Sequence, residues 1–125
     1  MKNIVILIFI GFLTLFTQSV YGQCDSSDTN LDKALIPNVF TPNIDGFNDG
    51  FNIKLDCIVS LEKRIYNRWG ELLFKSQQIN EPWNGRTNSG VKVLEGTYFY
   101  IIDVTFYNLG TEMSETYKGS VTLLR

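Results

Sequence analysis

Histidine is absent from this 125-residue chain. Without histidine, neither a Ser-His-Asp or Cys-His catalytic site nor the usual zinc site can be built. After Gly22 no segment keeps a helical period, so no glycine-rich phosphate loop leads into a helix. Two carboxylate pairs could in principle serve a glycosidase, although acidic pairs are common and usually solvated: Asp45 with Asp49, and Asp103 with Glu115. We therefore predict that the chain is not an enzyme.

An excess of positive charge is missing as well. The chain has 11 Lys and Arg residues against 13 Asp and Glu residues, which gives a formal net charge of −2 at pH 7. These basic residues are scattered, whereas a nucleic-acid-binding protein gathers them on one face. We expect no nucleic-acid partner.

Residues 1–22 have the pattern of a secretory signal peptide. Lys2 precedes an apolar run from Ile4 to Phe16, and Val20-Tyr21-Gly22 puts small residues three and one before a cut after Gly22. A membrane anchor is the alternative, but the run falls well short of the roughly 20 apolar residues that a spanning helix needs. Cleavage would leave an exposed lead-in and one small domain without a membrane span, over residues 23–35 and 36–125.

Cysteine is scarce, with only Cys24 and Cys57. Export implies an oxidising compartment, so a disulfide between them is the first expectation. Closing this loop would stabilise the fold by roughly 4 kcal/mol in the chain-entropy model. Two alternatives stay open because spacing alone does not decide pairing: a lipid on Cys24, or free thiols.

From Ile36 onward the pattern is that of β-strands. The clearest strand is Thr97 to Tyr107, whose inward face is predicted to carry Tyr98, Tyr100, Ile102, Val104 and Phe106. Because its start is apolar on both faces, this strand should be central or covered. The other expected strands are Ile36 to Phe40, Phe51 to Leu55, a hairpin of Leu61 to Trp69 with Leu72 to Lys75, and Glu115 to Arg125. The pattern predicts an all-β sandwich of about six to eight strands.

The turn between the first two expected strands is rich in side-chain oxygens. Pro and Gly residues favour a structured turn, and four side chains could converge on a hard cation such as calcium: Asn43, Asp45, Asn48 and Asp49. The alternative is a turn in which these side chains bond backbone amides. The sequence favours that alternative since calcium usually takes six or more oxygen ligands. We expect no cofactor, and calcium is the only candidate ion.

Trp69 and Trp83 are the remaining candidates for a binding site. Exposed aromatic rings on a β-sandwich can stack on sugar rings, so both are candidates for glycan stacking. Packing in the core or at a corner is the alternative, and it is favoured because a Trp side chain buries a large area.

Four ordered blocks of the sequence resemble one known family. They are Ile36 to Asn43 with Asp45-Gly46-x-Asn48-Asp49-x-Phe51, then Ile65 to Phe74, then Trp83-Asn84-Gly85 continuing to Gly96-Thr97-Tyr98-Phe99-Tyr100, and finally Lys118 to Arg125. Together they resemble the gliding motility-associated C-terminal domain, the type B sorting domain of the type IX secretion system of Bacteroidota. Three positions depart from that pattern: Ile44 in place of Gly, Lys63 in place of an apolar residue, and Asn84 in place of Asp.

The resemblance implies an immunoglobulin-like antiparallel β-sandwich of about seven strands that serves as an export address. The chain would pass the inner membrane by its signal peptide and then the outer-membrane type IX translocon, with a partner of the SprF-like kind, to the cell surface or the medium. Little sequence lies between the signal peptide and the domain, so we expect almost no cargo. The last strand is expected at a sheet edge, where five residues would meet the partner: Lys118, Gly119, Val121, Leu123 and Arg125. The alternative function is a small surface module for adhesion or glycan binding, stabilised by calcium.

Overall fold

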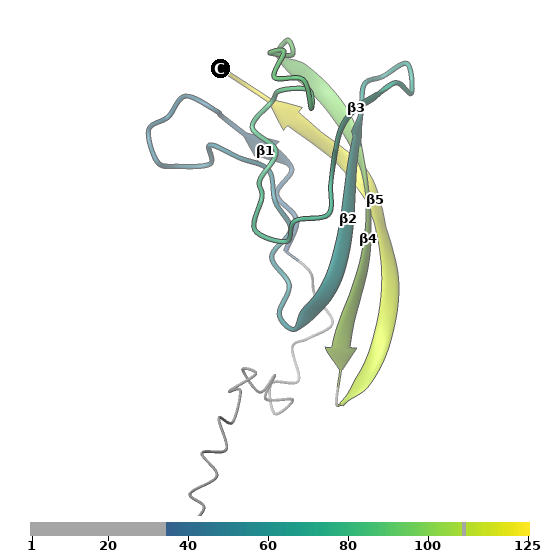
Figure 1. Cartoon of the computed structure of the whole chain (residues 1–125). Helices are drawn as coiled ribbons and strands as arrows, with labels where there is room; N and C mark the ends of the chain where they lie inside the picture. The colour runs from purple at the N-terminus through teal and green to yellow at the C-terminus, as the bar shows by residue number, and fades with distance from the viewer. Residues whose placement is uncertain (1–34, 109) are drawn as a thin grey trace, which may run out of the picture.

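The computed structural model describes residues 35–108 and 110–125. The predicted signal peptide, nearly all of the predicted lead-in and Cys24 lie outside the described residues. The described part contains no helix and five strands: β1 (Val39–Phe40), β2 (Ile58–Tyr66), β3 (Leu72–Ser76), β4 (Gly96–Asn108) and β5 (Thr111–Leu123). They form one sheet in the order β1-β5-β4-β2-β3 (Figure 1). The all-β prediction is confirmed.

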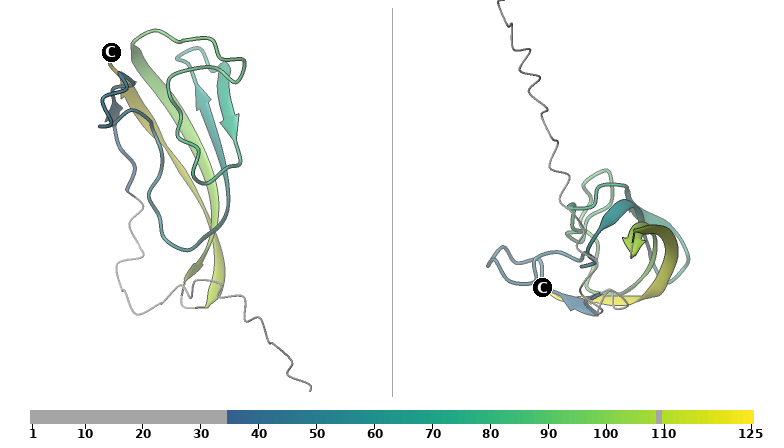
Figure 2. Two further views of the ribbon diagram at one scale, coloured as in Figure 1. Left: turned by 60° about the vertical axis from the view of Figure 1, so that its left-hand side comes forward. Right: turned by 90° about the horizontal axis from the view of Figure 1, so that it is seen from below.

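The sheet is mixed, and the described residues form five strands where about seven antiparallel ones were expected. β1 runs parallel to β5, and the other neighbours are antiparallel. The expected strand Phe51 to Leu55 is reduced to isolated bridges, Phe51 with Trp83 and Lys54 with Leu35. The segments before β2 and after β3 lie over one face of the sheet as irregular backbone (Figure 2). Their many Gly, Pro and Asn residues favour turns over ladders, so the second layer of this fold is made of loops.

β4 is the centre of the sheet, as the sequence predicts. It pairs with β2 on one side and with β5 along its full length on the other. Alternate residues point inward, and four of the five predicted inward side chains are buried: Tyr98, Ile102, Val104 and Phe106. Tyr100 is partly buried and packs against the same core. A two-residue period with both edges paired is what fixes the register of such a strand.

Aromatic rings join the loops to the sheet. Trp83 is fully buried, with its ring 5.2 Å from Phe40 on one side and 5.2 Å from Tyr98 on the other. Phe51 packs 5.1 Å from Tyr100. Tilted and edge-on aromatic pairs at such distances add to the stabilisation that burial provides. The irregular layer is therefore held on the sheet by side chains rather than by strand pairing.

Candidate functional site: the last strand and its open edge

The edge of β5 that faces away from β4 is mostly open among the described strands. β1 covers it only at Thr122 and Leu123. There the Thr122 N–H donates to the Asn38 carbonyl at 2.8 Å, and the Leu124 N–H donates to the Phe40 carbonyl at 3.1 Å. The expectation that the whole of Glu115 to Arg125 lies at an edge is therefore wrong for its last part, which is inserted between β1 and β4.

The direction of these bonds identifies which groups face the open edge. Backbone groups two residues apart along a strand point to the same side. Because the Thr122 N–H points toward β1, the N–H groups of Ser120 and Lys118 point toward the same, open side. The β4–β5 register has no irregularity between Thr111 and Leu123, so this parity holds along the strand. Two backbone donors are thus placed where an added strand could pair with them.

The end of β5 is anchored on the loop between β3 and β4. The Arg125 guanidinium donates to the carbonyls of Val93 and Gly85, at 2.6 and 3.3 Å. The Arg125 N–H donates to the Glu95 carboxylate. The Leu123 side chain is fully buried beside Gly85. These contacts fix the position of the last strand relative to the rest of the domain.

The five residues predicted to bind a partner differ in their exposure. Val121 and Leu123 are fully buried, so their side chains hold the strand in the fold and do not face a partner. Lys118 and Arg125 are exposed. Gly119 lies under the Tyr100 ring, where an added Cβ would be 2.4 Å from the Tyr100 hydroxyl. A partner approaching the folded domain here would meet the Lys118 side chain and the backbone edge.

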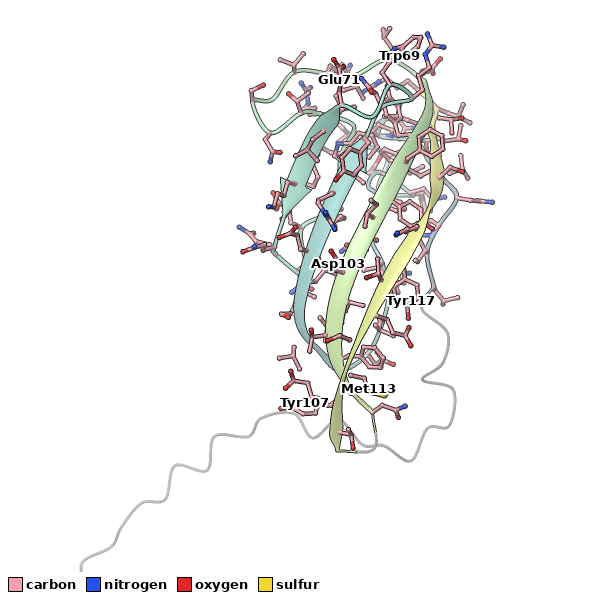
Figure 3. The ribbon with its side chains drawn as sticks, turned by 90° about the vertical axis from the view of Figure 1, so that its right-hand side faces the viewer. Trp69, Glu71, Asp103, Tyr107, Met113 and Tyr117 are labelled. Carbon is pink, nitrogen blue, oxygen red and sulfur yellow. The ribbon has the colours of Figure 1, made fainter. Side chains whose placement is uncertain are left out.

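The outer face of the sheet carries charged side chains, Asp103 among them (Figure 3), and those of β2, β3 and β4 are paired with one another. Arg64 bonds Asp103 and lies 3.4 Å from Glu62, and Lys75 lies 3.5 Å from the same Glu62 carboxylate. The Gln77 hydrogen bond, aided by these cations, lowers the pKa of Glu62. These ion pairs across β3, β2 and β4 leave little unbalanced charge on this side of the sheet.

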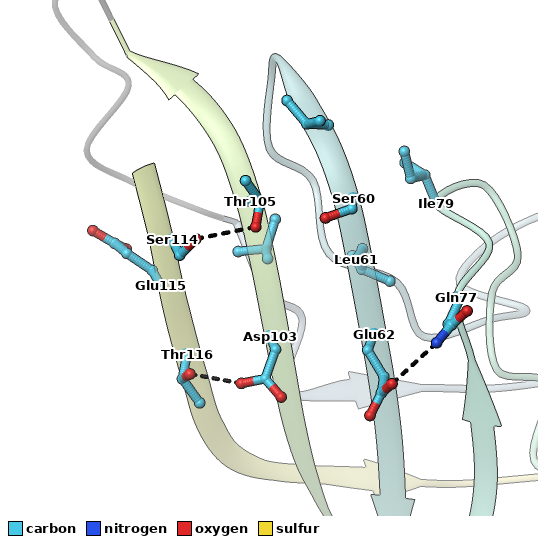
Figure 4. A pocket seen from close by; sticks show the side chains of 12 residues that line it. Ser60, Leu61, Glu62, Gln77, Ile79, Asp103, Thr105, Ser114, Glu115 and Thr116 are labelled. Carbon is cyan, nitrogen blue, oxygen red and sulfur yellow. Dashed lines mark hydrogen bonds between the residues drawn. The ribbon is translucent and has the colours of Figure 1, made fainter. Parts of the chain in front are cut away.

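A groove of about 580 Å³ lies beside the same charged side chains (Figure 4). Its polar side chains bond one another: Thr105 with Ser114 at 3.1 Å, Thr116 with Asp103 at 2.6 Å, and Gln77 with Glu62 at 3.2 Å. Because these groups satisfy each other, the groove has few donors or acceptors to spare for a ligand.

The oxygen-rich turn binds its own backbone. The two carboxylate oxygens of Asp49 accept the N–H groups of Ile44 and Gly46, at 2.8 and 2.7 Å. Asn43 and Asp45 each accept the N–H two residues on, and Asn48 takes a positive φ of 51°. This is the alternative that the sequence favoured, with side chains that mimic turns. In the part of the chain that the structure describes, no group of three or more His, Cys, Asp or Glu side chains is placed to hold a metal.

The two tryptophans, Trp69 and Trp83, differ in how far their side chains are exposed to solvent. Trp83 is fully buried, and its indole N–H donates to the Arg86 carbonyl at 2.8 Å, so it has no free face for a sugar. Trp69 is 75% exposed at the turn between β2 and β3. The Arg68 guanidinium lies 4.8 Å above its ring. Only Trp69 remains a candidate for stacking.

Two further sequence features concern Cys57 and Lys63. Cys57 is disulfide-bonded, whereas Cys24 lies outside the described residues, so their pairing stays a prediction.

Lys63, which departs from the family pattern, is fully buried. Its position between inward-facing Leu61 and Ile65 could have signalled this burial, because residues two apart share a face. The groups that surround Lys63 come from distant segments and could not be found from the sequence.

A family model described as the CHU_C type IX secretion signal domain matches residues 34–123, which include all five strands. The chain belongs to this family of CHU_C type IX secretion signal domains. No curated protein matches the sequence. Among solved structures, the chain is similar to PorZ, described as an essential bacterial surface component of the type IX secretion system of Porphyromonas gingivalis. The identity is 24% and the TM-score 0.44, over 76% of this chain and 12% of that one.

Within this CHU_C domain, three of the four sequence blocks that resembled sorting domains meet at the end of β5. The first block contributes β1 and Phe40, the third contributes Trp83 and Gly85, and the last contributes Leu123. These segments are far apart in the sequence and form one packed corner. Over the described residues, no helix is long and apolar enough to cross a membrane.

Proposed function

We propose that this domain is a non-enzymatic address for export through the outer membrane by the type IX secretion system. The observation that carries the proposal is the family match over residues 34–123. The destination would be the cell surface or the medium. The partners would be the outer-membrane translocon and an outer-membrane protein of the SprF-like kind.

We infer further that the partner recognises the folded domain along the open edge of β5. Val121 and Leu123 are buried, so a partner that read their side chains would first have to unfold the end of the domain. The backbone N–H groups of Lys118 and Ser120 face the open edge and support recognition by an added strand. The charged side chains of β2, β3 and β4 on the outer face are less suited to recognise a partner, because they are paired with one another.

The test removes one edge donor while the β4 ladder is kept. Lys118→Pro deletes an N–H that points away from β4, and proline is tolerated at such edge positions. Lys118→Ala is the matched control, since it removes the side chain and keeps the N–H. In a host with an intact type IX system, we expect surface delivery to fall strongly for Lys118→Pro and to stay near wild type for Lys118→Ala. Circular dichroism would check that both variants fold. Normal delivery of a folded Lys118→Pro chain would refute edge recognition.

Removing residues 119–125 tests the wider claim that the last strand is required. We expect surface delivery to be lost, because the truncation removes the edge and two buried anchors, Val121 and Leu123. Normal delivery of the truncated chain would contradict the proposal that the domain is the address.

A second candidate function is glycan binding at Trp69, which its exposure favours. A cavity of about 390 Å³ is lined by Trp69 together with residues just before and at the start of β4, including Leu94, Glu95 and Thr97. This candidate does not require calcium, since the turn of Asn43 to Asp49 is held by hydrogen bonds from its own backbone to the Asp49 carboxylate. Glycan binding by the purified domain that disappears in Trp69→Ala and persists in Trp69→Phe would support it. No binding to a broad glycan panel would exclude it.

A further inference from the structure

The most unusual group in the core is the amine of Lys63. The whole residue is buried, and its side chain points inward from β2 between Leu61 and Ile65. Burial lowers the pKa of this amine from its ordinary 10.5 to about 8, although the charge of Glu81 opposes the shift. A lysine in such a site carries a much larger fraction of neutral, nucleophilic amine near neutral pH than a surface lysine does.

An amide carbonyl group lies directly against this amine. Nζ of Lys63 is 2.6 Å from Oδ1 of Asn52, which brings it close to the amide carbon, Cγ. The Asn52 side-chain nitrogen points elsewhere and donates to the Ile79 carbonyl at 3.0 Å. The carbonyl oxygen of the amide is therefore turned toward Lys63, and its nitrogen, the leaving group of an acyl transfer, bonds a different segment. Holding two reacting groups in contact removes much of the entropic barrier to such a reaction.

A carboxylate completes the cluster. Nζ of Lys63 also donates to the backbone carbonyl of Glu81 at 2.6 Å. The Glu81 carboxylate accepts the Ser76 hydroxyl, and Ser76 is the residue of β3 that pairs with Lys63 of β2. The acid side chain is thus held by Ser76 in a partly buried position, near enough for its charge to raise the pKa of the amine. A carboxylate so placed can accept and return protons during nucleophilic attack.

We propose that Lys63 and Asn52 form an isopeptide bond inside this domain, with Glu81 moving the protons. The new bond joins Nζ of Lys63 to Cγ of Asn52, and the bond that breaks is Cγ–Nδ2 of Asn52. The Lys63 ammonium brings three hydrogens and the amide brings two. One stays on the new amide nitrogen and four leave with Nδ2 as ammonium, so atoms and charge balance. No oxidant, metal or cofactor is needed.

The bond would connect the loop layer to the sheet. Asn52 belongs to the irregular segment before β2, and Lys63 lies within β2. The link would replace a buried charge by a neutral amide and would remove the desolvation cost of that charge. This inference is independent of the proposed export function.

The direct test is the intact mass of the purified mature chain after reduction of its disulfide. Formation of the link removes one ammonia, so we expect a deficit of about 17 Da against the sequence mass. An N-terminal glutamine, which Gln23 would become, can lose the same mass by cyclising. The deficit must therefore be located by peptide mapping. We expect one branched peptide that contains both Asn52 and Lys63, and no trypsin cleavage after Lys63.

Variants separate the chemistry from the fold. Lys63→Met and Asn52→Ala should have no linked peptide, and Lys92→Met, which changes an exposed lysine, should keep it. Glu81→Gln retains both reacting groups, and we expect it to fold, by circular dichroism, with the link absent or formed at least tenfold more slowly. Separate Asn52 and Lys63 peptides in the wild type, after days at 37 °C, would overturn the proposal. Linking of Glu81→Gln at the wild-type rate would overturn the role of Glu81.

Discussion

Gly85 and Leu123 are packed so closely that a Cβ on Gly85 would lie 2.5 Å from Cδ1 of Leu123. The same position has a φ of 78°, in the left-handed region. Leu123 is fully buried and has little room to move away. The Trp-Asn-Gly block and the last strand are therefore fitted to each other, although 38 positions apart (123 − 85). A glycine at position 85 is required both by its backbone angle and by its neighbour.

Gly85→Ala should lower the free energy of unfolding by about 2–5 kcal/mol. Left-handed backbone costs a non-glycine residue about 1–2 kcal/mol, and overpacking of a core adds about 1–3 kcal/mol. Gly90→Ala is the control, since Gly90 has a φ of 89° but no atom within 4 Å of an added Cβ. It should lose only the backbone part, about 1–2 kcal/mol. Urea denaturation measures both, and equal losses would contradict the packing argument.

Ile44→Gly should stabilise the domain. Ile44 has a φ of 63° and is 95% exposed, so it bears backbone strain and makes almost no packing contact. Relief of about 1–2 kcal/mol of strain, less the entropy that glycine adds to the unfolded chain, leaves a gain of up to about 1 kcal/mol. Ile44→Val keeps a β-branched side chain at this φ and should be neutral. A loss of stability in Ile44→Gly, seen by urea denaturation, would show that the side chain contributes more than its exposure suggests.

The two tryptophans should respond differently to truncation. Trp83→Ala should cost about 3–5 kcal/mol, because it opens a cavity between Phe40 and Tyr98. Trp69→Ala removes an exposed ring and should change stability by less than about 0.5 kcal/mol. Thermal or urea unfolding of the two variants checks this. A large loss for Trp69→Ala would mean that its ring supports the β2–β3 turn.

The rate of the proposed Lys63–Asn52 link should depend on pH through the neutral amine. Its pKa is lowered to about 8, so the neutral fraction rises about tenfold per pH unit below pH 8 and levels off above it. Refolding the denatured, newly made chain at pH 6 to 9.5 and following the loss of ammonia by mass gives this profile. A rate that keeps rising to pH 9.5 would indicate an amine with an ordinary lysine pKa.

The parts of this fold that sequence could predict are those with strong local periodicity. β4 and the β2–β3 hairpin were expected near their observed positions, because alternation of apolar residues fixes their faces. The segment Phe51 to Leu55 was expected as a strand and is not one, since its neighbour Trp83 bridges only Phe51. The parallel pairing of β1 with β5 joins segments about 80 residues apart, and no local signal specifies it.

The candidate site was predictable only in part for the same reason. Lys63 lies two residues from each of the inward-facing Leu61 and Ile65, and this alternation indicates that it is buried. Its partners Asn52 and Glu81 lie 11 and 18 residues away in the sequence and are brought to it by tertiary packing alone. Likewise, the sequence identified the last strand as important. It did not reveal that Val121 and Leu123 are core residues while the backbone at Lys118 faces the open edge.

The most direct test of the export proposal is a fusion of residues 36–125 to a fluorescent passenger that carries its own signal peptide. It would be expressed in a bacterium with an intact type IX system and in a mutant lacking that system, with the unfused passenger as control. Passenger fluorescence would be measured in the medium and on the cell surface, where added protease can remove it. We predict external passenger only for the fusion in the intact strain. Retention of the fusion in the periplasm of both strains would contradict the proposal that this domain is an export address.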